Sequence, residues 1–221
     1  MKLNLSKPIL YLITRGATTE ATTAGSPEYK EIFEQVSAAI AAGIDLIQIR
    51  EKRMTARILF ELTRQSVDLA RGTATRVLIN DRADIAAGAG ADGVHLTTHS
   101  IDAVTIRRTF GNDFVIGVST HSVDEARSAR DAGADFIVFG PVFDTASKRE
   151  YGVPVGVEKL SHVTGELADF TVLALGGVTM DNFALCLNAG AHGLAGISLF
   201  SQPQAFARIA AQIKNGVSDE D

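Results

Sequence analysis

The most reactive pattern in the sequence is a pair of cations near position 50, in the segment Gln48-Ile49-Arg50-Glu51-Lys52. Side chains of a strand point alternately to opposite faces, so we expect Gln48 and Arg50 to point inward and Lys52 to lie just above the strand end. Arginine offers a planar fork of donors and lysine a compact charge, and together they suit an anionic ligand. The alternative is a solvated ion pair involving Glu51.

An amide and a carboxylate follow the next apolar run, at Asn80-Asp81. Asp81 is the best candidate for a metal ligand, because Mg²⁺ usually takes one or two protein carboxylates and completes its shell with waters and substrate phosphates. The alternative is that Asp81 or Asp84 caps the following helix, and for Asp84 we favour the cap.

Two histidines lie in or after apolar runs. Ser119 and His121 stand at the end of an apolar run, where both could face the mouth of the fold. By its position, His121 is the best candidate for a general acid or base. Its alternative is a loop residue beside Ser122, which would cap the next helix with Glu125 as its partner. His95 sits within an apolar run, and we interpret it as a hydrogen-bonded core histidine.

Two residue pairs near the end of the chain could bind phosphate through the main chain. Gly176-Gly177 and Ile197-Ser198 each end an apolar run. Glycine allows a backbone N–H to approach a phosphate closely, and barrel enzymes commonly bind phosphate after strands seven and eight. These pairs are the most specific indication of a ligand that the residues alone provide.

Two longer segments are candidates for working loops. One runs from Arg15 to Tyr29, and the other, from Pro141 to Pro154, contains Thr145, Ser147 and Lys148. Hydroxyl groups beside a lysine predict that the second segment closes over an anion.

These candidate residues lie in or just after short, β-branched apolar segments, and these segments alternate with segments of helical spacing. Continuously apolar strands indicate a parallel sheet buried on both faces, so the pattern predicts a single-domain (β/α)8 TIM barrel. A doubly wound open sheet is the rival, but it usually has fewer strands and a glycine fingerprint after the first one. The predicted strands are residues 9–14, 45–49, 76–80, 93–96, 114–118, 136–140, 171–175 and 193–197.

An internal repeat supports the barrel. Ala-Gly-Ile-Asp at 42–45, Ala-Gly-Ala-Asp at 89–92 and 132–135, and Ala-Gly-Ala-His at 189–192 stand at or before alternate strands. We interpret the glycines as left-handed residues after helices, on the face opposite the chemistry.

The overall composition narrows the class of protein. A length of 221 residues fits one domain, with the barrel core at 8–200, a final helix at 201–215 and a tail at 216–221. A net charge of −5 argues against nucleic-acid binding, and the single cysteine, Cys186, for which we expect no chemistry, suits a reducing compartment. The first apolar run is too short for a signal peptide or a membrane span. We therefore expect a cytoplasmic protein with small-molecule partners and no membrane, and its assembly into a homo-oligomer stays open.

Together, these segments resemble the thiamine-phosphate synthase family, which also contains the thiazole tautomerases. The resemblance runs from about Leu10 to Ser198, in order and at matching strand ends. The segments that carry it are QIREK at 48–52, NDR at 80–82, GADGVHL at 90–96, STH at 119–121, GPVF at 140–143, TASK at 145–148 and ALGGV at 174–178.

The resemblance implies a Mg²⁺-dependent TIM barrel that joins hydroxymethylpyrimidine diphosphate to a thiazole phosphate and releases diphosphate. It implies a diphosphate grip with Mg²⁺ on Asp81, a cleft lined by hydroxyl groups, and a thiazole phosphate held by main-chain contacts. The grip would consist of Arg50, Lys52, Asn80 and Lys148, the cleft of Ser119, Thr145 and Ser147, and the phosphate contacts of Gly177, Ile197 and Ser198.

The chain departs from the family pattern at three places. Ser100 stands where the synthases usually have a second metal aspartate, Ser147 replaces a threonine, and Arg15 follows the first strand where an aspartate is common. These departures keep two alternatives open, a thiazole tautomerase that uses His121 and a catalytically silent barrel that binds a thiamine precursor. We favour the synthase because a tautomerase has no use for a diphosphate grip.

Overall fold

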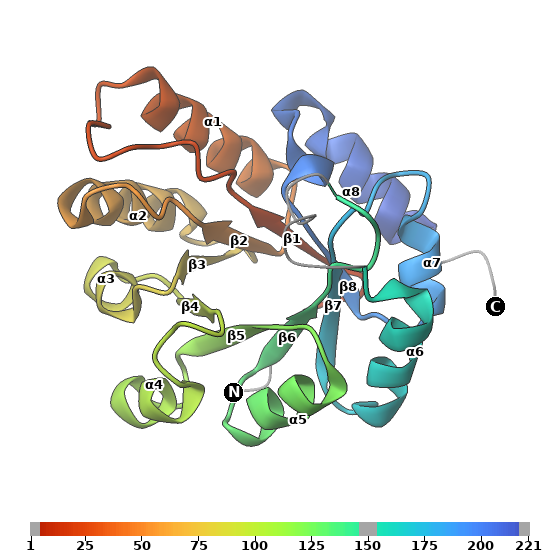
Figure 1. Cartoon of the computed structure of the whole chain (residues 1–221). Coiled ribbons are helices and arrows are strands. Elements are labelled where there is room, and N and C mark those ends of the chain that lie inside the picture. Colours follow the sequence, from red (N-terminus) through yellow and green to blue (C-terminus); the bar gives the residue numbers. More distant parts are fainter. Residues whose placement is uncertain (1–4, 146–153, 217–221) are drawn as a thin grey trace.

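A computed structural model describes residues 5–145 and 154–216, which form a closed parallel barrel surrounded by helices (Figure 1). The strands pair in chain order, and β8 pairs back onto β1 with Tyr11 opposite Ala195. The strands are β1 (Ile9–Ile13), β2 (Leu46–Ile49), β3 (Arg76–Asn80), β4 (Gly93–Leu96), β5 (Val115–Thr120), β6 (Phe136–Phe139), β7 (Thr171–Leu175) and β8 (Gly193–Gly196). The predicted fold class is confirmed, and every predicted strand boundary lies within two residues of the observed one.

The helices cover the outside of the barrel because each has an apolar face. In α2, for example, Leu59, Leu62 and Ser66 are buried at helical spacing. The α-helices are α1 (Pro27–Ala41), α2 (Ala56–Ala70), α3 (Ala83–Ala89), α4 (Ala103–Phe110), α5 (Val123–Asp131), α6 (Gly156–Glu166), α7 (Phe183–Asn188) and α8 (Phe206–Asn215). Two 3₁₀ helices, η2 (Ser198–Phe200) and η3 (Pro203–Ala205), lie between β8 and α8.

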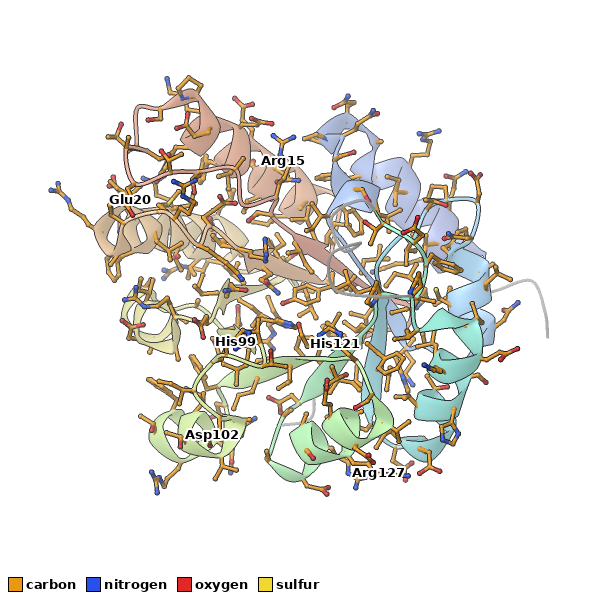
Figure 2. All side chains as sticks on the ribbon, in the orientation of Figure 1. Arg15, Glu20, His99, Asp102, His121 and Arg127 are labelled. Carbon is orange, nitrogen blue, oxygen red and sulfur yellow. The ribbon has the colours of Figure 1, made fainter. Side chains whose placement is uncertain are left out.

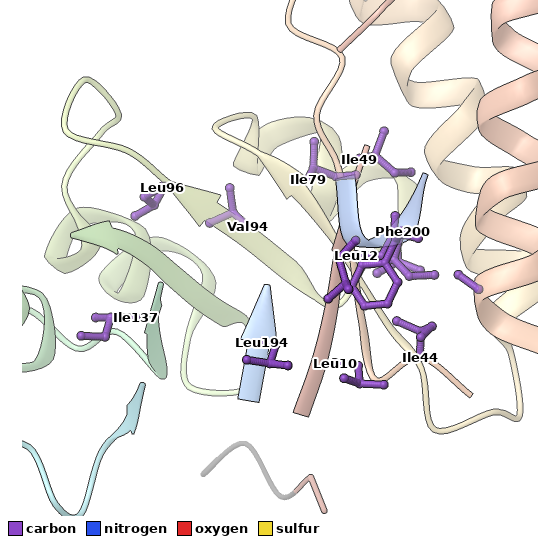
Figure 3. Close-up of a cluster of buried hydrophobic side chains, with 14 of the residues drawn as sticks. Leu10, Leu12, Ile44, Ile49, Ile79, Val94, Leu96, Ile137, Leu194 and Phe200 are labelled. Atoms are coloured by element: carbon purple, nitrogen blue, oxygen red, sulfur yellow. The ribbon is translucent and has the colours of Figure 1, made fainter. Parts of the chain in front are cut away.

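Strand alternation divides the apolar side chains into two clusters. Tyr11, Leu78 and Phe136 fill the inside of the barrel, whereas Leu10 and Ile47 belong to the cluster that packs the strands against the helices. Figure 3 shows part of this outer cluster. No helix within the described ranges is long and apolar enough to cross a membrane.

The repeated Ala-Gly-x-Asp segments form a scaffold at the amino-terminal ends of the strands, as predicted. Each repeat aspartate accepts a backbone N–H from the preceding strand and pairs with a cation. Asp45 binds Leu10 N at 2.9 Å and Lys214, Asp92 binds Val77 N at 2.8 Å and Arg76, and Asp135 binds Ile116 N at 2.7 Å and Arg107. In the fourth repeat, His192 Nδ1 accepts Val172 N at 3.4 Å. The four repeat glycines all have positive φ, between 70° and 89°.

Candidate active site

An aromatic and polar layer forms the floor of the barrel mouth. The rings of Tyr11, His95 and Phe136 lie 5.6 to 5.9 Å apart, centroid to centroid. Gln48 points inward, as predicted, and donates from Nε2 to the Tyr11 hydroxyl at 2.8 Å. Gly117 makes room for this layer, because a Cβ there would lie 2.3 Å from Phe136 Cζ and 2.7 Å from His95 Nδ1.

The end of β2 is fastened to the loop that follows β1 by the carboxylate of Glu51. This side chain is 2% exposed and accepts four hydrogen bonds, from Thr14 Oγ1 at 2.7 Å, Gly16 N at 3.1 Å, Thr18 N at 3.2 Å and Thr18 Oγ1 at 2.9 Å. Thr14 Oγ1 in turn accepts from Arg50 N at 2.8 Å. The alternative of a solvated ion pair involving Glu51 is therefore wrong, because the carboxylate is enclosed by main-chain and hydroxyl donors of its own loop.

Arg50 is the half-buried cation of the mouth. Its Nη1 lies 3.1 Å from the position that a Cβ on Gly16 would occupy, so the loop after β1 packs directly against the guanidinium group. Arg50 makes no ion pair with any residue in 5–145 or 154–216. Lys52 is exposed, as expected of a residue above the rim. An arginine that is positioned by its neighbours and has no carboxylate partner among the residues that the structure describes can bind an anion.

His95 is buried inside the barrel, which confirms its interpretation as a core histidine. Its Nε2 lies 2.9 Å from Ser119 Oγ, and Nδ1 is buried without a hydrogen-bond partner among the described residues. Burial, with a smaller contribution from the positive charge of Arg50, lowers the pKa of His95 to about 3. The imidazole is therefore neutral near pH 7.

Asn80 and Asp81 end β3 at the same face as Arg50. Asn80 is buried, whereas Asp81 is exposed and has a left-handed φ of 66°. The main chain of Asp81 is held by its N–H, which donates to the carbonyl of His95 at 2.9 Å. This arrangement leaves an exposed carboxylate at the carboxyl end of a strand, where it could bind a cation.

The helix cap that we favoured at Asp84 is wrong, and so is the alternative in which Asp81 caps the helix. Helix α3 begins after Arg82 without a side-chain cap, and Asp84 lies inside its first turn. The Asp84 carboxylate accepts from Arg82 Nε at 2.8 Å and Nη2 at 2.6 Å, and this contact lowers the pKa of Asp84. Ion pairing with the residue two positions earlier therefore replaces capping.

Ser100 has a local structural role at the place where the resemblance implies a second metal carboxylate. Its Oγ accepts from Thr97 N at 2.8 Å and closes the turn after β4, while His99 beside it is exposed. Within 5–145 and 154–216, no group of three or more His, Cys, Asp or Glu side chains could hold a metal ion. A metal at Asp81 would thus depend on waters and substrate oxygens for most of its ligands.

His121 lies at the carboxyl end of β5 (Figure 2), where Nδ1 donates to the carbonyl of Gly140 at 2.5 Å. A carbonyl oxygen only accepts, so this contact occupies Nδ1 and leaves Nε2 as the ring nitrogen that could contact a ligand. The Ser122 cap of α5 is confirmed, since Ser122 Oγ accepts from Glu125 N at 3.2 Å. The Glu125 carboxylate accepts from His121 N at 2.7 Å, one residue before the position that the capping box predicts.

The two predicted phosphate pairs lie side by side, because β7 and β8 are neighbours with Leu175 opposite Ala195. Gly176 and Gly177 have φ of 97° and 66°, and a Cβ on Gly177 would lie 2.6 Å from Asp144 O. The first part of the predicted closing loop packs on this turn, since Phe143 N donates to Gly176 O at 2.9 Å.

The remaining predicted residues of this end have different exposure. Ser198 is exposed at the start of η2, and Ile197 and Thr145 are half-buried. Ser147 and Lys148 lie outside the described residues.

Sequence reasoning missed the groups that fix these side chains in place. The burial of Glu51 and the contact of Gly117 with His95 each depend on a residue from another strand or loop. Because Glu51 stands between two cations in the sequence, its local pattern predicts an exposed ion pair. No local signal distinguishes this from a buried carboxylate that accepts hydrogen bonds from a neighbouring loop.

The fold and the site define a (β/α)8 barrel with a cationic corner and a glycine-lined corner at the carboxyl ends of its strands. The family model for thiamine monophosphate synthase matches residues 10–200, and the chain belongs to this family. The family resemblance and its class of enzyme, a transferase, are thereby confirmed.

Individual relatives agree with the family match. A putative thiamine-phosphate synthase of Geobacter sulfurreducens is 44% identical over 189 residues, which cover 86% of this chain and 84% of the relative. The thiamine-phosphate synthase of Methanoregula boonei is 38% identical, with 90% and 88% covered. The solved thiamine phosphate pyrophosphorylase of Pyrococcus furiosus superposes with a TM-score of 0.76 at 27% identity, covering 93% and 96%.

Proposed function

We propose that this barrel is a thiamine-phosphate synthase that joins hydroxymethylpyrimidine diphosphate to a thiazole phosphate with release of diphosphate. The observation that carries the proposal is Arg50, a half-buried arginine at the mouth without an ion pair among the described residues. A leaving diphosphate gains negative charge in the transition state, and a cation already held in place stabilises that charge without reorganisation. Glu51 and Thr14 supply this preorganisation.

The diphosphate would be bound by Arg50 and Lys52, which follow β2, by Asn80 at the end of β3, and by Lys148. The first three follow or end neighbouring strands, and Arg50 is close enough to His95 for its charge to lower the pKa of that imidazole. Gln48 supports the floor beneath the substrate through Tyr11. These residues bind and orient, so the reaction requires little acid–base catalysis from the protein.

Mg²⁺ fits this donor set as an ion that takes one protein carboxylate, Asp81. When bound, it would supply positive charge that neutralises the diphosphate oxygens. Ser100 is committed to the turn with Thr97, so the substrate itself would provide the anionic ligands that a second aspartate usually adds.

The thiazole phosphate would be bound at the opposite side of the mouth, by the main chain of Gly176, Gly177, Ile197 and Ser198. Gly176 and Gly177 both have a positive φ, which differs from that of a strand, and the neighbouring strands β7 and β8 bring the two residue pairs together. Ser119, Thr145 and Ser147 would line the cleft between the two substrates.

The direct test is to mix the purified protein with both substrates and Mg²⁺ and to measure thiamine phosphate. We expect product, and we expect Arg50→Gln to lower kcat/KM by about a hundredfold, because a charged hydrogen bond to phosphate is worth roughly 3 kcal/mol. The control is Arg71→Gln, a 77% exposed arginine paired with Asp68 at the end of α2. Absence of product from the wild-type protein would exclude the synthase.

A second candidate, the thiazole tautomerase, is favoured by one observation. The Gly140 carbonyl fixes Nδ1 of His121 as a donor and leaves Nε2 available to take a proton. Isomerisation of the thiazole carboxylate phosphate without the pyrimidine substrate, lost in His121→Asn, would establish it. If neither reaction occurs but thiazole phosphate binds, the chain is a silent barrel.

The net charge and the single cysteine support a cytoplasmic enzyme of phosphorylated small molecules without a nucleic-acid partner.

A further inference from the structure

The contact between His95 and Ser119 determines which hydrogen bonds Ser119 can offer to a ligand. His95 is 2% exposed, its ring packs with those of Tyr11 and Phe136, and it lies so close to the backbone of Gly117 that a Cβ there would be 2.7 Å from Nδ1. Only Nε2 finds a partner, Ser119 Oγ at 2.9 Å, while Nδ1 is buried without one in the described part of the chain.

The two neutral tautomers of this ring are unequal in energy. If Nδ1 carried the hydrogen, a buried N–H would lack an acceptor, which proteins rarely tolerate, whereas an unsatisfied acceptor is more common. The favoured tautomer therefore has its hydrogen on Nε2, where it donates to Ser119 Oγ, and leaves the bare lone pair on Nδ1.

This tautomer has a consequence for Ser119. Its oxygen already accepts from His95, so its own hydrogen is directed elsewhere. Ser119 is half-buried near the carboxyl end of β5, two residues beyond the barrel layer of Gly117, at the mouth. We infer that His95 is a positioning residue that makes the Ser119 hydroxyl a hydrogen-bond donor toward an acceptor atom of the bound substrate. The inference rests on the proposed function for the identity of that substrate.

The first test examines the wild-type protein and needs no turnover. A long-range ¹H–¹⁵N NMR spectrum distinguishes a protonated from a bare ring nitrogen, and we expect a protonated Nε2 and a bare Nδ1 for His95, with His95→Gln identifying the signals. The opposite tautomer overturns the inference. Because this result does not depend on product formation, a protein that makes no thiamine phosphate would refute the proposed function alone.

The second test is a double-mutant cycle that separates positioning from packing. His95→Leu removes the donor, and we expect kcat/KM to fall about tenfold, whereas His95→Gln, which can place an N–H near the former Nε2, stays within about threefold of wild type. In a Ser119→Ala background, His95→Leu should cause no further loss. Thermal unfolding of each variant monitors folding.

A tenfold loss that persists in the Ser119→Ala background would show that His95 only fills the core.

Competition by inorganic diphosphate locates the acceptor atom. If the acceptor is a diphosphate oxygen, Ser119→Ala weakens this competition, and if it is an atom of the pyrimidine ring, the competition is unchanged while KM rises.

Discussion

Replacing Glu51 with glutamine tests whether this buried carboxylate organises the mouth. The two oxygens of Glu51 each accept one backbone N–H and one threonine hydroxyl, from residues 14 to 18. The glutamine NH₂ replaces one oxygen, and a hydroxyl can rotate to accept from it, but a backbone N–H of Gly16 or Thr18 cannot. One buried donor is therefore left without an acceptor, and the remaining bonds lose their charge.

The expected loss follows from these contacts. A buried donor without an acceptor costs about 1 to 3 kcal/mol, and weakening the remaining bonds brings the loss of unfolding free energy to roughly 2 to 4 kcal/mol. For a chain of this length, we expect the midpoint of thermal unfolding to fall by about 5 to 10 °C. Because the loop after β1 packs against Arg50, kcat/KM should fall about tenfold.

The assays are urea unfolding followed by circular dichroism, and steady-state kinetics with the pyrimidine diphosphate varied. Glu34→Gln is the matched control, because Glu34 is an exposed glutamate on α1. If Glu51→Gln unfolds at the same urea concentration as Glu34→Gln and keeps full kcat/KM, the loop does not depend on this carboxylate and the reasoning is refuted.

Three further predictions concern the glycine corner, the metal and pH. Gly177→Ala should raise KM for thiazole phosphate and should destabilise the protein by more than Gly43→Ala does. Gly43 is the control because it shares the left-handed backbone, which alone costs about 1 to 2 kcal/mol, but has nothing within 4 Å of the new Cβ. Equal effects of the two substitutions on KM would contradict a phosphate site at Gly177. Ser100→Asp should lower the Mg²⁺ concentration for half-maximal activity about tenfold, and an unchanged Mg²⁺ titration would count against a metal at Asp81. The unfolded chain binds a proton at His95 below its ordinary pKa of 6.5, but the folded protein does so only near 3. The contribution of neutral His95 to the free energy of unfolding should thus be fully present above pH 6.5. It should decrease as the pH drops toward 3, by up to about 1.4 kcal/mol per pH unit. Urea unfolding across this range should show a shallower fall in His95→Gln, and an equal slope would show that His95 is not responsible.

The barrel could be predicted because the properties that define it are local. Runs such as Leu10 to Ile13 are apolar at every position, which indicates strands covered on both faces, and each is followed by a segment of helical period. The repeat at Asp45, Asp92 and Asp135 recurs at every second strand, and the structure shows its cause, a bond from each carboxylate to the preceding strand.

Part of the site was equally accessible from the sequence. Alternation along β2 placed Gln48 inside the barrel, and the position of Gly176-Gly177 at a strand end placed it at the mouth. The cap at Asp84 failed because a neighbouring arginine competes for the same carboxylate, and propensity alone does not rank two local partners.

The amino-acid sequence by itself determined the strands, the helices, the family and the end of the barrel at which the candidate residues gather, because hydrophobic period and strand ends are properties of short segments. Only the tertiary structure decided that Glu51 anchors a loop and that His95 faces Ser119, since each contact joins segments that are distant in the chain. Burial changes what such groups do: a glutamate that would be solvated becomes an anchor, and a histidine that would titrate near neutrality is held neutral.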